Sequence, residues 1–293
     1  MSGIGKVLVV GKGFFGEKLF RLLQSRGIEC EATTQQLEQG FTPLDITNKA
    51  SVDSAIADSR AETVVLTAAV SSVDYCEQHK EETFNVNVQG TKNVVAACKK
   101  NLSKLVFLST DYVFDGKKGN YSEKDSPNPL QYYGATKLLG EQDALEQLVD
   151  DVLVLRVSSL YGFNSSKDRP CFPVFVLNQL MRGKQVDASS QITCPTLIDD
   201  AADALVQLVE KNEKGIFHVV GAGSLSRLAA AKAVAREFRL DAKLIKKTGD
   251  LHFVAKRPED SSLSIKKLDS AGIRMNDFSN GLKIMKKQMG EFQ

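Results

Sequence analysis

The stretch Lys104–Glu141 reads KLVFLSTDYVFDGKKGNYSEKDSPNPLQYYGATKLLGE, and it decides how the rest of the chain is interpreted. The run Leu105–Leu108 is apolar and short, which is typical of a fully buried strand. The polar residues Ser109, Thr110 and Asp111 follow it. A parallel strand would present its carboxyl end there, and open α/β sheets bind ligands at that edge. A loop rich in Pro, Gly, Asn and Asp comes next, and a helix is predicted to begin near position 131.

Tyr133 and Lys137 lie four residues apart on this predicted helix, so both fall on one face. A tyrosine pKa is ordinarily about 10, and a neighbouring ammonium group favours the phenolate and lowers the pKa. The pair therefore predicts a general acid for a carbonyl oxygen that becomes an alkoxide. The hydroxyl of Thr110 would supply a second hydrogen bond to that oxygen. An ordinary surface Tyr and Lys is the competing interpretation, and a dinucleotide site elsewhere in the chain would decide against it.

The N-terminal segment carries such a site. Residues 6–10, KVLVV, form another buried-strand run, and GKGFFG follows with glycines at 11, 13 and 16. An amphipathic helix comes after the glycines, which is the context that a dinucleotide fingerprint requires. The glycines let the backbone turn tightly and approach a pyrophosphate at the helix N-terminus. Candidate cofactor-binding residues here are Gly11, Gly13, Phe14, Phe15 and Gly16.

The second predicted strand, residues 28–34, bears on the choice of cofactor. An acidic residue at its end would bind a ribose 2′-hydroxyl and favour NAD. Thr33, Thr34 and Gln35 occupy that end instead, and Glu31 would serve only if the strand register were shifted. This favours NADP, with NAD as the open alternative, and makes Thr34 a further candidate cofactor-binding residue.

Strands continue to alternate with helices. Further strands are predicted at 41–47, 62–67, 151–157 and 215–219, and helices at 48–59, 80–100, 172–182, 199–209 and 225–238, with short helices near the C-terminus. This order predicts an α/β fold with a Rossmann-type, doubly wound parallel sheet. We assign residues 1–160 to an NAD(P)-binding domain. Residues 161–293 form a mixed, mainly substrate-binding lobe, with segments that return to the first domain.

Composition narrows the function further. The 293 residues are 42% hydrophobic and 25% charged, with a net charge of +2, as is ordinary for a globular protein. We find no basic stripe interleaved with aromatics, no apolar run near the ~18 residues of a membrane span, and no signal-peptide pattern. The five scattered cysteines lack CxxC spacing and suggest reduced thiols in a cytoplasmic protein. Neither nucleic acid, membrane nor metal is expected as a partner.

With these residues in view, the sequence resembles the extended short-chain dehydrogenase/reductases, which include the NAD-dependent epimerases and dehydratases. Within them it is most similar to the dTDP-4-dehydrorhamnose reductase group. The similarity covers about residues 5–285. Its most specific pieces are AAVSSVDYCE (68–77), STDYVFDG (109–116), YGATKLLGE (133–141), LRVSSLYG (155–162), Pro195-Thr196 and the Arg257-Pro258 loop.

The resemblance implies roles for individual residues. Thr110, Tyr133 and Lys137 would be the catalytic triad. The NAD(P) site would add to the glycine loop Asp45, Ile46, Ala68, Ala69, Val70, Asn87 and Ser109, together with Tyr133 and Lys137 themselves. Asp74, Tyr112, Val113, Leu160 and Arg257 would border a nucleotide-sugar pocket. At the position of Leu160 these reductases usually have a Trp, and this chain contains none.

The resemblance implies NAD(P)-dependent reduction of a nucleotide-linked 4-keto-6-deoxy sugar, so the chain would be an oxidoreductase. Two alternatives stay open. One is another sugar-nucleotide enzyme, an epimerase or a dehydratase. Dehydratases tend to follow Thr-Asp with Glu, whereas Tyr112 follows Asp111 here. The other is a non-catalytic, NADP-binding regulatory subunit similar to the β subunit of methionine adenosyltransferase. A homodimer is an assembly that we keep open.

Overall fold

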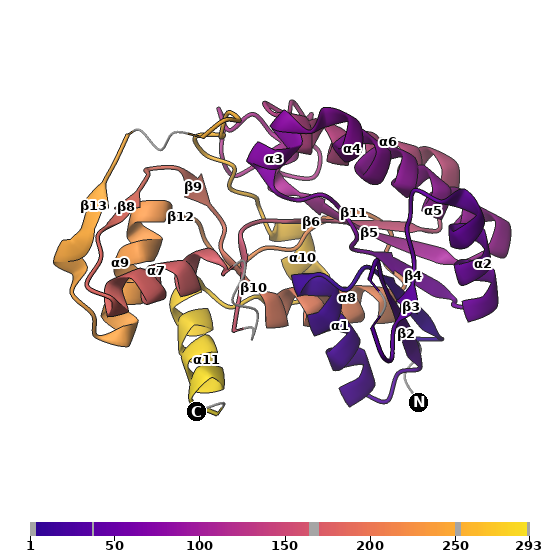
Figure 1. Ribbon diagram of the computed structural model, residues 1–293, viewed down its shortest axis with the longest axis horizontal. Coiled ribbons are helices and arrows are strands. Elements are labelled where there is room, and N and C mark those ends of the chain that lie inside the picture. The colour runs from indigo at the N-terminus through magenta and orange to yellow at the C-terminus, as the bar shows by residue number, and fades with distance from the viewer. Residues whose placement is uncertain (1–3, 37, 164–169, 250–252, 292–293) are drawn as a thin grey trace.

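In the computed structural model, which describes residues 4–36, 38–163, 170–249 and 253–291, the larger part of the chain is built on a seven-stranded sheet (Figure 1). The strand order is β11-β6-β5-β4-β1-β2-β3, and every neighbouring pair is parallel. The strands are β1 (Val7–Val10), β2 (Cys30–Thr34), β3 (Thr42–Pro43), β4 (Thr63–Leu66), β5 (Lys104–Thr110), β6 (Val152–Val157) and β11 (Gly215–His218). The chain runs outward from β1 to β3 and then crosses to β4 on the other side of β1. This reversal places a ligand crevice at the carboxyl ends of β1 and β4.

Side chains that alternate along each strand build two separate cores, one on each face of the sheet. Val7 and Val9 of β1 pack in a core with α1 (Phe14–Ser25), α8 (Ile198–Glu210) and α10 (Lys266–Ser270). Leu8 and Val10 point the other way, into a core with α2 (Lys49–Ser59), α5 (Thr91–Asn101) and α6 (Tyr132–Leu148). Both faces are therefore covered, which explains why the strands are continuous apolar runs.

The helix predicted over residues 80–100 is interrupted. It comprises α4 (Lys80–Phe84), a π-helix over Asn85–Gly90 and α5, and the short helix α3 (Val73–Gln78) precedes it. Single π-helical turns are often found at functional sites. Two other predicted boundaries also shift. The strand predicted at 41–47 is reduced to two residues, and Thr110 is the last residue of β5.

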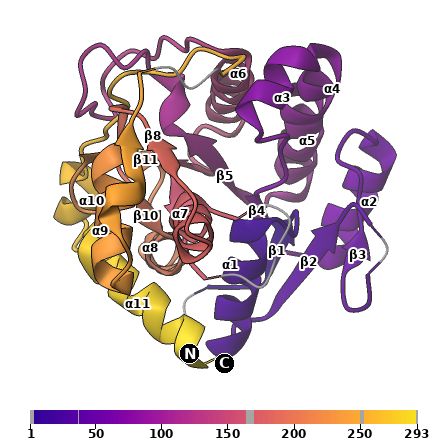
Figure 2. The same ribbon diagram turned by 60° about the vertical axis from the view of Figure 1, so that its left-hand side comes forward.

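The rest of the chain forms a second lobe beside the sheet, at the left of Figure 1. Its core lies between α7 (Phe172–Met181), α9 (Arg227–Phe238) and α11 (Phe278–Glu291). Short strand pairs complete it: β8 (Val186–Ala188) with β13 (Ile245–Lys247), and β9 (Ile192–Thr193) with β12 (Leu225–Ser226). Another pair is β7 (Leu160–Tyr161) with β10 (Thr196–Leu197), and β10 leads directly into α8, beside which it is labelled in Figure 2. The final helix has 14 residues, longer than the short helices predicted there.

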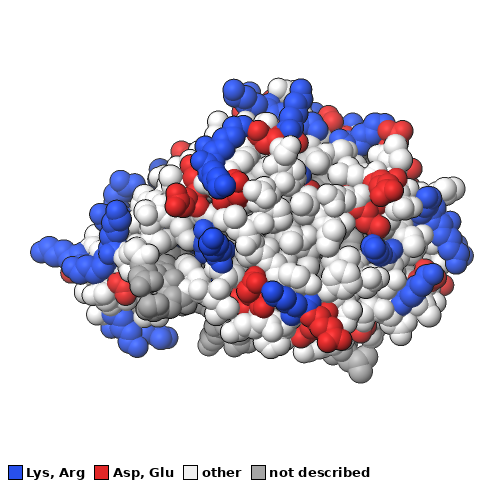
Figure 3. Space-filling view, turned by 90° about the horizontal axis from the view of Figure 1, so that it is seen from above, with Lys and Arg blue, Asp and Glu red and all other residues white. Residues whose placement is uncertain are grey.

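Charge is distributed without a dominant sign. On the face seen in Figure 3, basic and acidic side chains are interspersed, in keeping with the net charge of +2. No helix in the described ranges is both long and apolar enough to cross a bilayer.

Candidate active site

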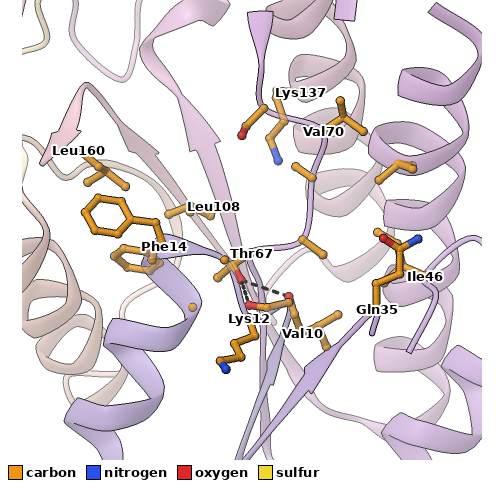
Figure 4. Close-up of a pocket in the computed structure, with 18 of the residues that line it drawn as sticks. Val10, Lys12, Phe14, Gln35, Ile46, Thr67, Val70, Leu108, Lys137 and Leu160 are labelled. Carbon is orange, nitrogen blue, oxygen red and sulfur yellow. Dashed lines mark hydrogen bonds between the residues drawn. The ribbon is translucent and has the colours of Figure 1, made fainter. Parts of the chain in front are cut away.

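A cavity of about 880 Å³ opens at the carboxyl ends of the central strands (Figure 4). Most of the site residues predicted from the sequence line this cavity. These are Gly11, Gly13, Phe14, Phe15, Gly16, Thr34, Asp45, Ile46, Ala68, Ala69, Val70, Ser109, Thr110, Tyr133, Lys137 and Leu160. The structure thus brings together a glycine loop, three small residues after β4 and the proposed triad, which are up to about 130 positions apart in the chain.

The glycine loop is shaped for close backbone approach. Gly11 has φ +107°, and a Cβ there would lie 2.6 Å from the amide nitrogen of Ala68, so another residue would be strained and would collide. A Cβ on Gly16 would collide with the carbonyl oxygen of Gly11. Gly13, by contrast, has open space beside it and precedes the first turn of α1, which no side chain caps. A dinucleotide pyrophosphate fits this arrangement, because free N–H groups and the helix dipole face the cavity.

Two threonines that the sequence analysis did not assign support this loop. Thr67, just after β4, donates a hydrogen bond of 2.6 Å from Oγ1 to the carbonyl oxygen of Gly11. The hydroxyl of Thr33 accepts one of 3.2 Å from the amide of Gly11. Figure 4 shows Thr67 reaching across to the loop. Both hydrogen bonds form because the strands β2 and β4 lie next to β1. In the sequence, the position of each threonine at the end of a strand is the only indication of this role.

The end of β2 is free of carboxylates, as predicted. Glu31 pairs with Leu8 in register, and its carboxylate lies 2.6 Å from Nζ of Lys6, so the alternative in which it binds a ribose is wrong. Lys12, in the glycine loop, lines the cavity and forms an ion pair with Glu38, while its Nζ lies 4.2 Å from the ring centroid of Phe41. Lys12 and Thr34 therefore line the same cavity, in which the end of β2 lacks the acid of NAD-specific sites.

Thr110 and Tyr133 meet at one wall of the cavity. Thr110 ends β5, and Tyr133 lies in the first turn of α6, whose N-cap Gln131 accepts a 2.7 Å hydrogen bond from the amide of Gly134. Burial and the charge of Asp111 raise the pKa of Tyr133, against a smaller opposing effect of the Thr110 hydroxyl. The expected lowering of the Tyr133 pKa is therefore wrong, because burial outweighs the neighbouring ammonium group of Lys137. The phenol stays protonated at neutral pH, as a proton donor requires.

Lys137 is itself perturbed. Only 3% of it is exposed, and its Nζ lies 4.0 Å from the ring centroid of Phe107. Burial lowers its pKa to about 7, with a smaller opposing effect of Glu141. A strongly perturbed group in a cleft is typical of a functional site.

A buried ion pair fixes α6 against the sheet behind the triad. Glu141, one turn after Lys137, accepts hydrogen bonds of 2.6 Å from Nη2 and 3.0 Å from Nε of Arg156 on β6, and another from the hydroxyl of Ser109. Both charged side chains are at most 2% exposed. Replacing either partner alone would leave an uncompensated buried charge.

Asn87, predicted to contact the cofactor, does not line the cavity. Its amide forms hydrogen bonds of 2.8 and 3.0 Å with the backbone N–H and C=O of Val70, and donates one of 3.1 Å to the hydroxyl of Thr136 on α6. The π-helix thus holds the segment after β4 against the helix that bears Tyr133.

The residues predicted to border a sugar pocket are only partly brought together. Arg257 pairs with Asp74 at 3.0 Å, and the amide of Ala255 donates a 2.9 Å hydrogen bond to the same carboxylate. This contact ties the loop around Arg257 to α3. Tyr112 packs edge-on against Tyr133, with 6.5 Å between ring centroids. Val113 is fully buried in a core cluster. Of the residues predicted to border the sugar, only Leu160 lines the cavity, and Asp74, Tyr112, Val113 and Arg257 do not.

Asp111 is a further residue that the sequence analysis left without a role. It is 3% exposed and accepts hydrogen bonds of 3.1 Å from Thr110, 2.8 Å from Ser158 and 2.6 Å from Ser261. Burial raises the pKa of this carboxyl, and the three hydroxyls partly offset the rise. Asp111 therefore joins the end of β5 to the end of β6 and to a loop 150 residues later. Within the described ranges, no three His, Cys, Asp or Glu residues are grouped as a metal site would require.

A doubly wound sheet with a glycine loop at its switch point, and Thr, Tyr and Lys on the facing wall, defines an extended short-chain dehydrogenase/reductase. Comparison with known proteins agrees. The profile of the RmlD substrate binding domain matches residues 5–290, and the chain belongs to this family. The family and the fold predicted from the sequence are thereby confirmed.

Three relatives illustrate the range of the family. The dTDP-4-dehydrorhamnose reductase of Aggregatibacter actinomycetemcomitans is 32% identical, over 96% of this chain and 98% of its own. The structure of the Bacillus anthracis dTDP-4-dehydrorhamnose reductase in complex with NADP superposes with a TM-score of 0.89 at 26% identity, over 97% of this chain and 99% of the other. The methionine adenosyltransferase 2 subunit beta of Bos taurus is 28% identical, over 95% and 86%.

Proposed function

We propose that this protein is an NAD(P)-dependent oxidoreductase that reduces the keto group of a nucleotide-linked 4-keto-6-deoxy sugar, as dTDP-4-dehydrorhamnose reductases do. One observation carries the proposal: Thr110, Tyr133 and Lys137 line the same cavity as the glycine loop, in a chain that matches such reductases over nearly its whole length.

When bound, a nicotinamide cofactor would supply a hydride to the sugar C4. The side chains of the protein act on the keto oxygen of the sugar. Tyr133, protonated at neutral pH, donates its proton to the keto oxygen as negative charge develops there. The hydroxyl of Thr110, which donates to Asp111 in this structure, turns to the same oxygen as a second donor. Lys137 is placed to bind the nicotinamide ribose, and its ammonium form favours the phenolate left after proton transfer.

The alternatives make different demands on the site. A dehydratase would need a second acid after Asp111, and that position is Tyr112, whose pKa is raised by burial. A regulatory subunit needs no turnover. The similarity to the methionine adenosyltransferase 2 subunit beta of Bos taurus is the reason to test this alternative.

We further propose a cytoplasmic location, because Cys30, Cys76, Cys98, Cys171 and Cys194 are all unpaired. The homodimer stays a prediction that light scattering tests.

The test is a fluorescence titration with NADPH and NADH, followed by addition of dTDP-4-keto-6-deoxy-hexose. We expect cofactor binding and substrate-dependent oxidation. Tyr133→Phe should lower kcat by about 10²–10⁴-fold, the usual contribution of a general acid. Tyr132→Phe, one position away on the same helix, is the matched control and should keep full activity. Cofactor binding without turnover on several nucleotide-sugar ketones would contradict the proposal and favour the regulatory role.

A further inference from the structure

Glu77, the last residue of the segment AAVSSVDYCE, was left without a role by the sequence analysis. It belongs to the short helix α3, which packs against α6 (Figures 1 and 2). Its Oε2 accepts a hydrogen bond of 3.0 Å from the backbone amide of Tyr132, the first residue of α6. A side chain 55 positions earlier in the chain therefore holds the residue directly before the proposed proton donor.

The first turn of α6 is held on both sides of Tyr133. The side chain of the N-cap residue Gln131 accepts a 2.7 Å hydrogen bond from the amide of Gly134, and Glu77 accepts one from the amide of Tyr132. The first N–H groups of a helix lack partners within the helix, so such acceptors decide how firmly the first turn is fixed. The bond to Gln131 is local. The bond to Glu77 ties the same turn to another element of the fold.

The helix α3 is itself anchored at two further points. Asp74, one turn before Glu77, forms an ion pair of 3.0 Å with Arg257. The thiol of Cys76 donates a hydrogen bond of 3.3 Å to the carbonyl oxygen of Val70, which lines the cavity. Because α3 has only six residues, these contacts fix the whole helix, and Glu77 reaches α6 from a firm support.

A purely electrostatic role of Glu77 is the competing interpretation. Its Oε1 lies 3.3 Å from Nζ of Lys80, and negative charge near a helix N-terminus is favourable. Neither effect fixes the position of a neighbouring side chain, whereas a direct hydrogen bond to the backbone does. Proton transfer is sensitive to position, since a displacement of about 1 Å can slow a reaction about 100-fold.

We propose that Glu77 is a positioning residue for the reduction, because its hydrogen bond to the amide of Tyr132 sets the phenol of Tyr133 against the keto oxygen. Glu77 does not line the cavity, so it acts only through the backbone of α6. The inference rests on the proposed function, since it concerns the proton that Tyr133 donates in that reaction.

Two matched substitutions separate the hydrogen bond from the charge. Glu77→Gln keeps the length of the side chain and an oxygen acceptor, but removes the charge. Glu77→Asp keeps the charge, but is one methylene shorter and loses its reach to the amide. We expect Glu77→Asp to lower kcat for ketone reduction by about 10–100-fold with unchanged KM and unchanged Kd for NADPH, and to raise the solvent deuterium isotope effect on kcat. Glu77→Gln should stay within about twofold of the wild type.

Two control variants complete the comparison. Lys80→Met removes the ion pair and leaves the hydrogen bond to the amide in place. Glu81→Gln changes an exposed acid in the first turn of α4. Both should have the kcat of the wild type. If circular dichroism shows that Glu77→Asp is not folded, Glu77→Ala takes its place, with the same expected loss.

The opposite results overturn the inference. A kcat of Glu77→Gln as low as that of Glu77→Asp, or an equal loss in Lys80→Met, would show that charge matters. A folded Glu77→Asp with the kcat of the wild type would show that the hydrogen bond only stabilises the fold. The proposed function fails in another way, through absence of ketone reduction by the wild type. Amide hydrogen exchange at Tyr132 then decides: exchange that is faster in Glu77→Asp than in Glu77→Gln keeps the positioning of this turn, and equal exchange overturns it.

Discussion

Lys137 should destabilise the protein when no cofactor is bound. The residue is 3% exposed, and burial lowers its pKa from 10.5 to about 7. Because each pKa unit corresponds to about 1.4 kcal/mol, keeping the charged form of Lys137 in the folded protein costs up to roughly 5 kcal/mol of folding free energy. Lys137→Met removes the charge and keeps the length of the side chain. It also loses the attraction of the ammonium for the Phe107 ring, so we expect a net gain of about 2–3 kcal/mol.

The gain should depend on pH in a defined direction. Below pH 7 Lys137 is protonated in both the folded and the unfolded protein, and the wild type carries the full cost of burying the charge. Between pH 7 and 10.5 the unfolded chain binds more protons than the folded protein, so wild-type stability rises with pH relative to the variant. The advantage of Lys137→Met should therefore be largest at pH 6 and should shrink towards pH 10.

Urea unfolding of the cofactor-free protein, followed by circular dichroism at pH 6, 7.5 and 9, measures this difference. Lys100→Met, at an exposed position of α5, is the control and should show no comparable gain. A Lys137→Met variant that is less stable than the wild type at pH 6, or a gain that does not change with pH, would refute the reasoning. The variant should also lose ketone reduction, so that stability and activity move in opposite directions.

Three further outcomes are expected. Arg156→Met should lower the free energy of unfolding by about 3–5 kcal/mol, since Glu141 is left charged and buried, and Glu141→Leu in the same chain should recover most of the loss in a urea double-mutant cycle. Lys12→Gln should raise the Kd for NADPH about 10-fold or more and leave that for NADH unchanged in fluorescence titration, because only NADPH offers a 2′-phosphate to the lysine. Gly11→Ala should abolish cofactor binding and cost on the order of 2 kcal/mol or more by thermal unfolding, given a φ of +107° and the contact with Ala68.

The parts of the fold that depend on local pattern could be predicted from the sequence. Apolar runs flanked by glycines or polar residues located β1, β4, β5 and β6 to within about two residues, because strands covered on both faces must be continuously apolar. The break of the helix over 80–100 could not be found in this way. Its π-helical turn is stabilised by Asn87, whose partner Val70 comes from another part of the chain.

The same distinction applies to the site. The glycine loop and the Tyr133–Lys137 pair are local motifs, so spacing alone pointed to them. Thr67 and Asp111 act through partners 56 and 150 positions away, and no local pattern marks them. The direction of the Tyr133 pKa was also missed, because it is set by burial and by Asp111 rather than by the helix neighbour four residues on.

The hydrogen bonds of Asp111 have a consequence for the order in which the polypeptide is made. Thr110 and Ser158 leave the ribosome long before Ser261, which supplies the shortest of the three hydrogen bonds to this carboxylate. A nascent chain can assemble the central strands early, but the wall behind the reacting groups stays incomplete until almost the whole protein has been synthesised. In chains that stop before residue 261, the carboxylate of Asp111 therefore lacks the hydrogen bond that Ser261 donates in the complete protein. For this protein, the N-terminal half alone therefore lacks one of the three hydrogen bonds that hold Asp111 beside the reacting groups.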